Sequence, residues 1–180
     1  MQRILFICTG NICRSPMAQV FLQHIADQRG LPLSLESAGL LPAGRAPTPE
    51  AVAVMRTRGF DTSRHRSRGL RVALTQPPDL VIGLAGEHVE EVLERRPELA
   101  SRTFTLRELV RLALQAGARR GDEELDGYLG RLDAQRGGAG ADDDIADPIG
   151  QSLSVYEACA AEIEGLVEQA AALLWPVTPS

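Results

Sequence analysis

The chain has 180 residues, 44% of them hydrophobic, which suits one folded domain over residues 1–180 and differs from the composition of a disordered chain. Its net charge of −5 offers no broad basic face to nucleic acid, and no apolar run has the length of a membrane-spanning helix, so we expect neither kind of partner. Its three cysteines are too few for a disulfide scaffold, and they favour a reducing, cytoplasmic setting.

The first predicted elements are a buried strand and an amphipathic helix, joined by a tight loop. Residues 3–7 are mostly apolar and β-prone, and from Pro16 onward apolar residues recur at helical spacing. The residues between them, 8–15, are here termed the phosphate loop, with the sequence Cys8-Thr9-Gly10-Asn11-Ile12-Cys13-Arg14-Ser15. Backbone N–H groups in such a loop and at a helix N-terminus can bind the oxygens of a phosphoryl group. We therefore predict that residues 9–15 bind phosphate.

Two side chains of the phosphate loop can carry chemistry. Arg14 can donate two hydrogen bonds to two oxygens of a phosphoryl group. The positive end of the following helix favours the thiolate form of Cys8, and the hydroxyl of Ser15 can donate to that thiolate. A thiolate beneath a bound phosphoryl group is placed for in-line attack on phosphorus. The loop thus predicts a nucleophilic site, with a half-buried cysteine in an ordinary strand–helix turn as the alternative.

Strands and helices alternate along the middle of the chain. Strands are predicted over residues 33–39, 79–84 and 102–105, and helices over residues 49–59, 86–96 and 106–117. This order predicts an α/β fold, with a parallel sheet and helices on both of its faces. Ligands bind such sheets at the carboxyl ends of the strands, where Cys8 stands.

The C-terminal part contains a polar segment, an Asp-Pro turn and a long helix. Residues 118–144 form a Gly- and Asp-rich segment around one short amphipathic helix, and we expect partial mobility across its glycines. Pro148 stiffens the backbone at Asp147, and a carboxyl group on a rigid surface loop suits proton donation to a leaving group. The last helix is predicted to open with a capping box at Ser154 and Glu157.

The phosphate loop resembles that of the low-molecular-weight protein tyrosine phosphatases of bacteria. Its residues stand as that family has them, directly after an N-terminal strand, at Cys8, Gly10, Asn11, Cys13, Arg14, Ser15 and Pro16. The resemblance extends over residues 3–175. It implies a single-domain, flavodoxin-like three-layer sandwich whose four-stranded parallel sheet has the strand order 2-1-3-4. Compared with the family, residues 118–144 look like a longer insertion before the Asp-Pro turn.

The same resemblance implies a reaction and its catalytic residues. Cys8 is the nucleophile, Arg14 binds the phosphoryl group, and Asp147 is the general acid. The reaction hydrolyses a phosphate monoester through a cysteinyl-phosphate intermediate. We expect no metal and no cofactor, because Arg14 and the loop amides neutralise the charge of the phosphoryl group.

Supporting residues follow from the resemblance as well. Four residues are implied to support the phosphate loop, namely Asn11, Ser15, Ser37 and His65. Three residues are candidate walls of the substrate cleft, namely Leu40, Leu41 and Ile149. His24 and His88 lie in predicted helices and are interpreted as surface or packing residues.

The substrate is the least determined part of this prediction. A phosphoprotein is the expected partner, and phosphate or another oxyanion the expected ligand or inhibitor. Relatives that dephosphorylate arginine carry threonine at the position of Ile12, and isoleucine there resembles the tyrosine-specific branch. Tyrosine enzymes usually carry an aromatic residue at the position of Ile149, however. Phosphotyrosine is therefore the favoured substrate and phosphoarginine the alternative.

Other functions fit the sequence less well. A catalytically silent phosphoprotein-binding module would be expected to lack Cys8, Arg14 or Asp147. Arsenate reductases of this scaffold need further redox cysteines after the third strand, a nucleotide-binding loop needs a following Gly-Lys-Ser/Thr, and a zinc site needs further ligands near Cys8 and Cys13; none of these occurs. In the family this cysteine pair can form a reversible disulfide, and simple packing of Cys13 is the alternative.

Overall fold

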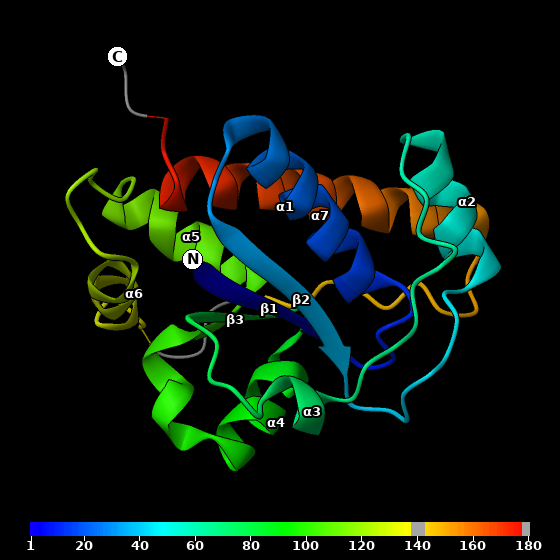
Figure 1. Ribbon diagram of the computed structural model, residues 1–180, viewed down its shortest axis with the longest axis horizontal. Helices are drawn as coiled ribbons and strands as arrows, with labels where there is room; N and C mark the ends of the chain where they lie inside the picture. Colours follow the sequence, from blue (N-terminus) through cyan, green and yellow to red (C-terminus); the bar gives the residue numbers. More distant parts are fainter. Residues whose placement is uncertain (138–142, 178–180) are drawn as a thin grey trace.

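Four parallel strands form the centre of the structure, a computed structural model that describes residues 1–137 and 143–177 (Figure 1). The strands are β1 (Gln2–Cys8), β2 (Leu33–Gly39), β3 (Leu80–Gly83) and β4 (Thr103–Thr105). Their spatial order is β2-β1-β3-β4 and every pairing is parallel, which confirms the predicted sheet. Because β1 has a hydrogen-bonded strand on each side, it places Cys8 at the carboxyl end of an interior strand.

Helices cover both faces of the sheet, as predicted (Figure 1). On one side lie α1 (Arg14–Arg29), α2 (Pro49–Thr57), α5 (Leu106–Ala116) and α7 (Leu153–Leu174). On the other side lie α3 (Leu70–Ala73), α4 (Gly86–Arg95) and the 3₁₀ helix η1 (Pro97–Arg102). Side chains of β1 alternate between two cores, since Ile4 and Phe6 pack under α1 and α7 while Leu5 and Ile7 pack against α3 and α4. None of the helices in the described residues is long and apolar enough to span a membrane.

The start of α7 differs from the prediction. The helix begins at Leu153, with Ser152 as its N-cap residue, so the predicted capping box at Ser154 and Glu157 is wrong. Ser154 lies inside the first turn, where its hydroxyl is 2.9 Å from that of Ser152. Two serines, Ser152 and Ser154, are separated by one residue here, and the earlier one is the helix boundary.

The segment before the Asp-Pro turn contains the predicted short helix, α6 (Leu125–Asp133). α6 buries Tyr128 together with Leu125, Leu129 and Leu132, and it packs against α5 and η1 at the β4 side of the sheet. The N–H of Arg119 donates to the carbonyl of Leu173 at 2.8 Å, which ties the start of this segment to the end of α7. The mobility expected across the glycines concerns in part residues 138–142, which lie outside the described residues.

The two ends of the described chain meet beside β1. The indole Nε1 of Trp175, just after α7, donates a hydrogen bond to Oε1 of Gln2 at 2.7 Å. This contact lies at the amino end of β1, and the phosphate loop lies at its carboxyl end. Both ends of the central strand are therefore fixed by contacts to helices.

Candidate active site

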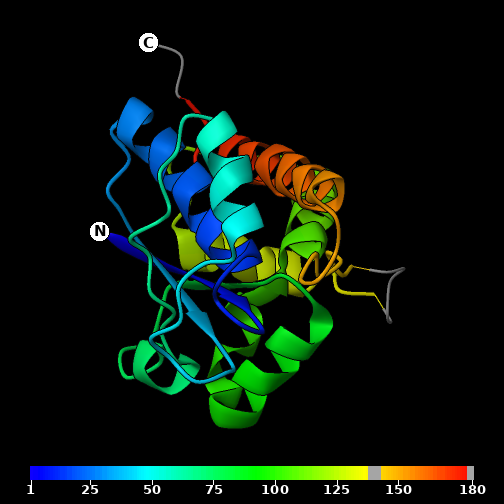
Figure 2. The same ribbon diagram turned by 90° about the vertical axis from the view of Figure 1, so that its right-hand side faces the viewer.

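The phosphate loop is buried where β1 ends and α1 begins, on the side of the molecule that faces the viewer in Figure 2. Asn11 and Ser15 are fully buried, and Cys8 and Arg14 are 2% and 3% exposed. The N-cap residue of α1, Cys13, makes no side-chain hydrogen bond to the helix. The first N–H groups of α1 and the positive end of its dipole therefore point into the loop as anion-binding groups.

Two donors converge on the sulfur of Cys8. The N–H of Asn11 lies 3.2 Å from Sγ, and the hydroxyl of Ser15 lies 3.1 Å from it. Nδ2 of Asn11 donates to the same hydroxyl oxygen at 2.9 Å, so the proton of Ser15 is directed away from Asn11, with the sulfur at 3.1 Å and the carbonyl of Ala38 at 3.4 Å as its acceptors. Donors arranged in this way stabilise a thiolate, the nucleophilic form of cysteine.

Asn11 holds the phosphate loop in shape with its backbone and its side chain. Its φ of 49° lies in the left-handed region, and among residues 1–137 and 143–177 no other non-glycine residue has a positive φ. Oδ1 of Asn11 accepts the N–H of Arg68 at 2.8 Å, and its carbonyl accepts Nε2 of His65 at 2.8 Å. The predicted bracing contact of His65 is thus present. Burial lowers the pKa of His65 below its ordinary value, which keeps the ring neutral with Nε2 as the donor.

Ser37 does not contact the phosphate loop, and that prediction is wrong. Its hydroxyl donates to Oε1 of Gln19 on α1 at 2.6 Å. Ser37 is the register partner of Phe6, so it faces α1 from within the strand and does not reach the loop beyond the strand's end. Gly39 takes the supporting position instead. A Cβ there would lie 2.9 Å from both N and Cβ of Asn11, so glycine is required for this close approach.

Arg14 connects the phosphate loop to the Asp-Pro turn, 133 residues further along the chain. One of its terminal nitrogens donates to Oδ2 of Asp147 at 2.7 Å, and the other donates to the carbonyl of Ile145 at 2.8 Å. The N–H of Ile149 donates to Oδ1 of Asp147 at 3.2 Å, which orients the carboxylate. Residues 143–149 are termed the acid loop below. The structure thus brings Cys8, Arg14 and Asp147 together, as predicted.

Two residues at the start of α4 also contact the phosphate loop, a role that was not predicted from the sequence. The hydroxyl of Thr9 donates to Oε1 of Glu87 at 3.0 Å and lies 3.1 Å from Nε2 of His88. His88 is fully buried, so of the two predicted roles it has the packing role. Burial, and after it the charge of Arg14, lower the pKa of His88 to about 4. A histidine in the first turn after the neighbouring strand was the one available signal of this contact.

The candidate walls of the substrate cleft are tied to the phosphate loop. The N–H groups of Leu40 and Leu41 both donate to the carbonyl of Thr9, at 2.9 and 3.1 Å. Leu41 and Ile149 are 43% and 42% exposed, and they can therefore contact a substrate. Leu40 is half-buried and packs against the core around α3, so most of its side chain is directed away from the solvent.

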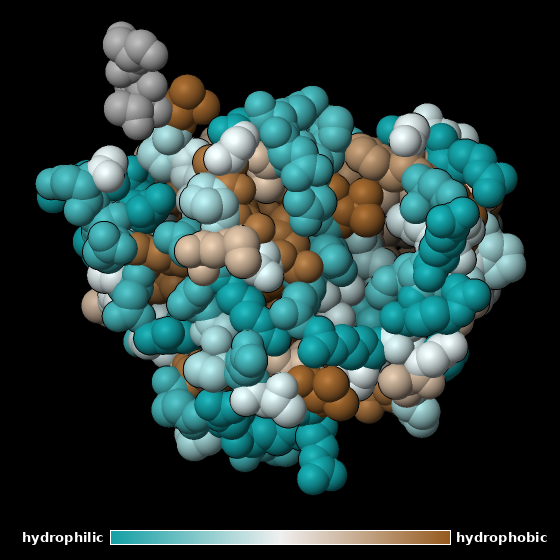
Figure 3. Space-filling model, in the orientation of Figure 1, coloured by the Kyte–Doolittle hydropathy of each residue, from teal (hydrophilic) through white to brown (hydrophobic). Residues whose placement is uncertain are grey.

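A basic side chain lies beside these candidate walls, and together they are termed the rim below. Arg45 is exposed, and its guanidinium lies beside Gly10, 3.5 Å from the place of a Cβ on that residue. Its backbone is fixed by Ser67, whose hydroxyl accepts the N–H of Arg45 at 2.9 Å. Hydrophilic side chains cover much of the surface around α2 and the neighbouring loops in Figure 3. The rim therefore combines exposed apolar groups with positive charge.

The three cysteines are free and buried. Burial raises the pKa of the Cys13 thiol far above its usual range and that of Cys159 to about 12. Cys159 lies on α7 and contacts the carbonyl of Ala146 at 3.8 Å through its sulfur. Both thiols are therefore protonated near neutral pH and act as packing groups, while a disulfide between Cys8 and Cys13 stays a prediction.

Known proteins match this combination of fold and loop. A family model described as low molecular weight phosphotyrosine protein phosphatase matches residues 3–119, more than half of the chain. The chain belongs to this family. It is accordingly a cysteine-based hydrolase, and its sheet and helices are those of a low molecular weight phosphatase.

Two kinds of relative are similar to this phosphatase. The protein-arginine-phosphatase of Geobacillus stearothermophilus is 32% identical over 171 residues, 94% of this chain and 93% of that protein. The probable low molecular weight protein-tyrosine-phosphatase EpsP of Ralstonia solanacearum is 38% identical over 111 residues, 61% of this chain and 73% of EpsP. The crystal structure of a low molecular weight protein tyrosine phosphatase from T. tengcongensis has a TM-score of 0.71 at 32% identity and covers 94% of this chain and 97% of that one.

Proposed function

We propose that this phosphatase hydrolyses phosphate monoesters on proteins, with phosphotyrosine as its preferred substrate. The observation that carries the proposal is the pair of donors on Cys8, beside an arginine that also contacts Asp147. Nucleophile, phosphoryl-binding cation and proton donor thus occupy one site. Phosphate and related oxyanions are the expected ligands and inhibitors, since the loop amides and Arg14 would bind them in the same way.

The first step transfers the phosphoryl group to sulfur. The Cys8 thiolate attacks phosphorus, the bond between phosphorus and the leaving oxygen breaks, and Asp147 gives its proton to that oxygen. The products are a cysteinyl-phosphate and the dephosphorylated residue. Arg14 and the N–H groups of the loop stabilise the charge on the phosphoryl oxygens in the transition state.

The second step releases phosphate. Asp147, now ionised, takes a proton from a water molecule, whose oxygen attacks phosphorus and breaks the bond to Cys8. The thiolate is regenerated together with inorganic phosphate, and the donors from Asn11 and Ser15 stabilise it as the leaving group. These residues supply nucleophile, acid, base and charge stabilisation, so we propose that the reaction needs no metal or other cofactor.

The choice of phosphotyrosine rests on the loop and its rim. Ile12 is 4% exposed, and the resemblance to the family places it where relatives that dephosphorylate arginine have threonine. Leu41 and Ile149 expose apolar surface on which an aromatic ring can pack. Phosphoarginine is the second candidate, and the similarity to an arginine phosphatase over 94% of this chain favours it.

The test measures phosphate release from a phosphotyrosine peptide and a phosphoarginine peptide of the same flanking sequence, with wild type and Cys8→Ser. We expect Cys8-dependent release that is faster from phosphotyrosine, while calorimetry shows that Cys8→Ser still binds inorganic phosphate. Faster release from phosphoarginine would retain the mechanism and replace the substrate. Phosphate binding without Cys8-dependent turnover of either peptide would identify a silent phosphoprotein-binding module.

Three further expectations belong to the proposal. Residues 1–180 act as one domain, and the segment 118–144, which begins near residue 119, where the family match ends, is an insertion before the Asp-Pro turn. The setting is the reducing cytoplasm, because the Cys8 thiolate must stay free. Phosphoproteins are the partners, and neither nucleic acid nor a membrane is required.

A further inference from the structure

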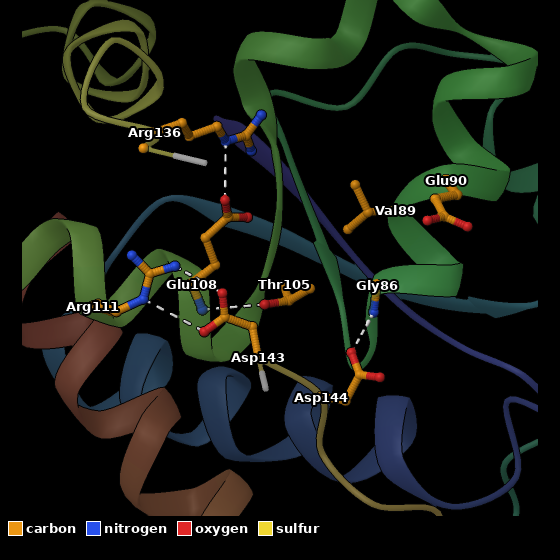
Figure 4. A pocket seen from close by; sticks show the side chains of 10 residues that line it. Gly86, Val89, Glu90, Thr105, Glu108, Arg111, Arg136, Asp143 and Asp144 are labelled. Atoms are coloured by element: carbon orange, nitrogen blue, oxygen red, sulfur yellow. Dashed lines mark hydrogen bonds and ion pairs between the residues drawn. The ribbon is translucent and has the colours of Figure 1, made fainter. Parts of the chain in front are cut away.

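The first turn of α4 contacts both loops of the active site. Glu87 and His88 reach the phosphate loop through the hydroxyl of Thr9. The preceding residue, Gly86, donates its N–H to Oδ1 of Asp144 in the acid loop at 2.6 Å (Figure 4). Three consecutive residues of one rigid helical turn therefore hold the nucleophile loop on one side and the acid loop on the other.

The contact with Asp144 compensates for a feature of α4 itself. The N-cap residue of this helix is Ala85, which has no side-chain acceptor for the first N–H groups. The carboxylate of Asp144 supplies the missing acceptor from a segment 58 residues away in sequence, and its negative charge suits the positive end of the helix. The helix start thereby becomes an attachment point for the acid loop.

The upstream end of the acid loop depends on polar contacts. Asp143 pairs with Arg111 of α5 at 2.7 Å, and Asp144 is held by Gly86 of α4. Both carboxylates border a cavity of about 500 Å³ between these two helices, as Figure 4 shows. Next in the chain, the N–H of Ile145 donates to the carbonyl of Leu84 at 2.8 Å. The backbone thus enters the site from fixed points on three elements.

We propose that the first turn of α4 sets the spacing between Cys8 and Asp147, with Asp144 as the positioning residue that holds the acid loop to it. The inference rests on the proposed function, because it assigns the proton donor to Asp147. Only Ile145 and Ala146 separate Asp144 from Asp147, a reach of about 10 Å at most over three residue steps, so a displaced anchor moves the acid directly. Displacement by about 1 Å is enough to slow a positioned proton transfer.

The experiment compares two aryl phosphates that differ in the need for an acid. Phenyl phosphate has a poor leaving group that requires protonation, whereas 2,4-dinitrophenyl phosphate has a good one that does not. For Asp144→Ala we expect kcat/KM to fall about fivefold on phenyl phosphate and less than twofold on dinitrophenyl phosphate. Asp144→Asn keeps an oxygen acceptor for Gly86 and should restore the wild-type ratio. Asp126→Ala removes an exposed aspartate from α6 and should leave both rates unchanged.

A second variant separates positioning from helix capping. Adding Ala85→Ser to Asp144→Ala supplies α4 with a local N-cap without restoring the link to the acid loop. We expect this double variant to regain thermal stability while the rate on phenyl phosphate stays low. Recovery of the rate together with stability would overturn the inference, and so would equal rate losses on both substrates, or no loss, in Asp144→Ala. Cys8-dependent turnover by wild type tests the proposed function separately. Failure of the proposed function can therefore be distinguished from failure of the positioning role of Asp144.

Discussion

The phosphate loop and the acid loop reach the same reacting centre in different ways. In the phosphate loop, the donors to Cys8 come from Asn11 and Ser15, at most seven residues away, and the side chains are buried. Asp147 accepts a hydrogen bond from Arg14, 133 residues away, and its side chain is 38% exposed. The nucleophile is thus positioned by local sequence and burial, and the acid by tertiary contacts at the surface. Substitutions in the first loop should affect folding and catalysis together, whereas substitution of the exposed Asp147 carboxyl in the second should affect catalysis alone.

Removal of the acid is the strongest test of this difference. We expect Asp147→Asn to lower kcat/KM about 10²- to 10³-fold on phenyl phosphate, because the leaving oxygen loses its proton donor. The loss on 2,4-dinitrophenyl phosphate should be at least tenfold smaller, and urea unfolding should be close to that of wild type, since the side chain is partly exposed. Equal losses on both substrates would count against Asp147 as the general acid.

Asn11 tests the buried loop. Asn11→Ala removes two side-chain hydrogen bonds. It also leaves alanine in the left-handed region, where alanine lacks the polar side chain that helps asparagine to adopt this backbone conformation. We expect it to lower the free energy of unfolding by about 3 kcal/mol and to slow turnover on both aryl phosphates alike. Asn11→Gly is the matched control, because it loses the same hydrogen bonds without the backbone strain and should be more stable than Asn11→Ala by about 1 kcal/mol. A normal unfolding curve for Asn11→Ala would show that the loop is not held by this residue.

His88 lies in the first turn of α4, which contacts both loops, and the pH dependence of the free energy of unfolding tests its burial there. Its folded pKa of about 4 lies below the unfolded value of 6.5, so its contribution to stability is complete above pH 6.5 and is lost as the pH falls toward 4. We expect wild type to lose about 2 kcal/mol more than His88→Gln between pH 7.5 and 5, measured by urea unfolding at both pH values. His24→Gln, which changes an exposed residue of α1, should keep the wild-type dependence. If the free energy of unfolding changed equally with pH in wild type and His88→Gln, the lowered pKa of His88 would be refuted.

The rim gives the smallest expected effect. Arg45→Ala removes an exposed positive charge beside the phosphate loop, and we expect KM for a phosphotyrosine peptide with acidic flanks to rise about two- to fivefold. KM for phenyl phosphate should stay within error, because that substrate has no flanking charges. Arg64→Ala, in an exposed loop that does not adjoin Gly10, is the control. A rise for both substrates would instead indicate that Arg45 acts on the phosphoryl group itself.

The sheet and the phosphate loop were predictable because their signals are contiguous. An apolar strand, a loop with a fixed pattern of Cys8, Arg14 and Ser15, and a helix start follow one another without a gap. The alternation of strands and helices gave the parallel sheet, whereas the strand order came from resemblance to the family. Asp147 likewise depended on that resemblance, because an Asp-Pro turn by itself is common.

The contacts that the sequence did not reveal are those between elements. Ser37 was expected to support the phosphate loop, but the register of β2 directs it to α1, and Gly39 makes the close approach to Asn11 instead. Asp144 belongs to the Gly- and Asp-rich segment, for which the sequence indicated no contact, whereas in the structure it caps α4. Such pairings depend on which segments the fold brings side by side. The polarity of a residue and its neighbours in sequence do not contain that information.

Because Trp175 is hydrogen-bonded to Gln2, its fluorescence reports on the structure around that contact. Trp175 is the only tryptophan of the chain, so its emission monitors the junction between the end of α7 and the beginning of β1. The phosphate loop lies at the opposite end of β1, about 20 Å away along a strand of seven residues. Substitutions in either catalytic loop therefore leave the fluorophore's surroundings intact, and its red shift on unfolding measures global stability without interference from the chemistry of the site.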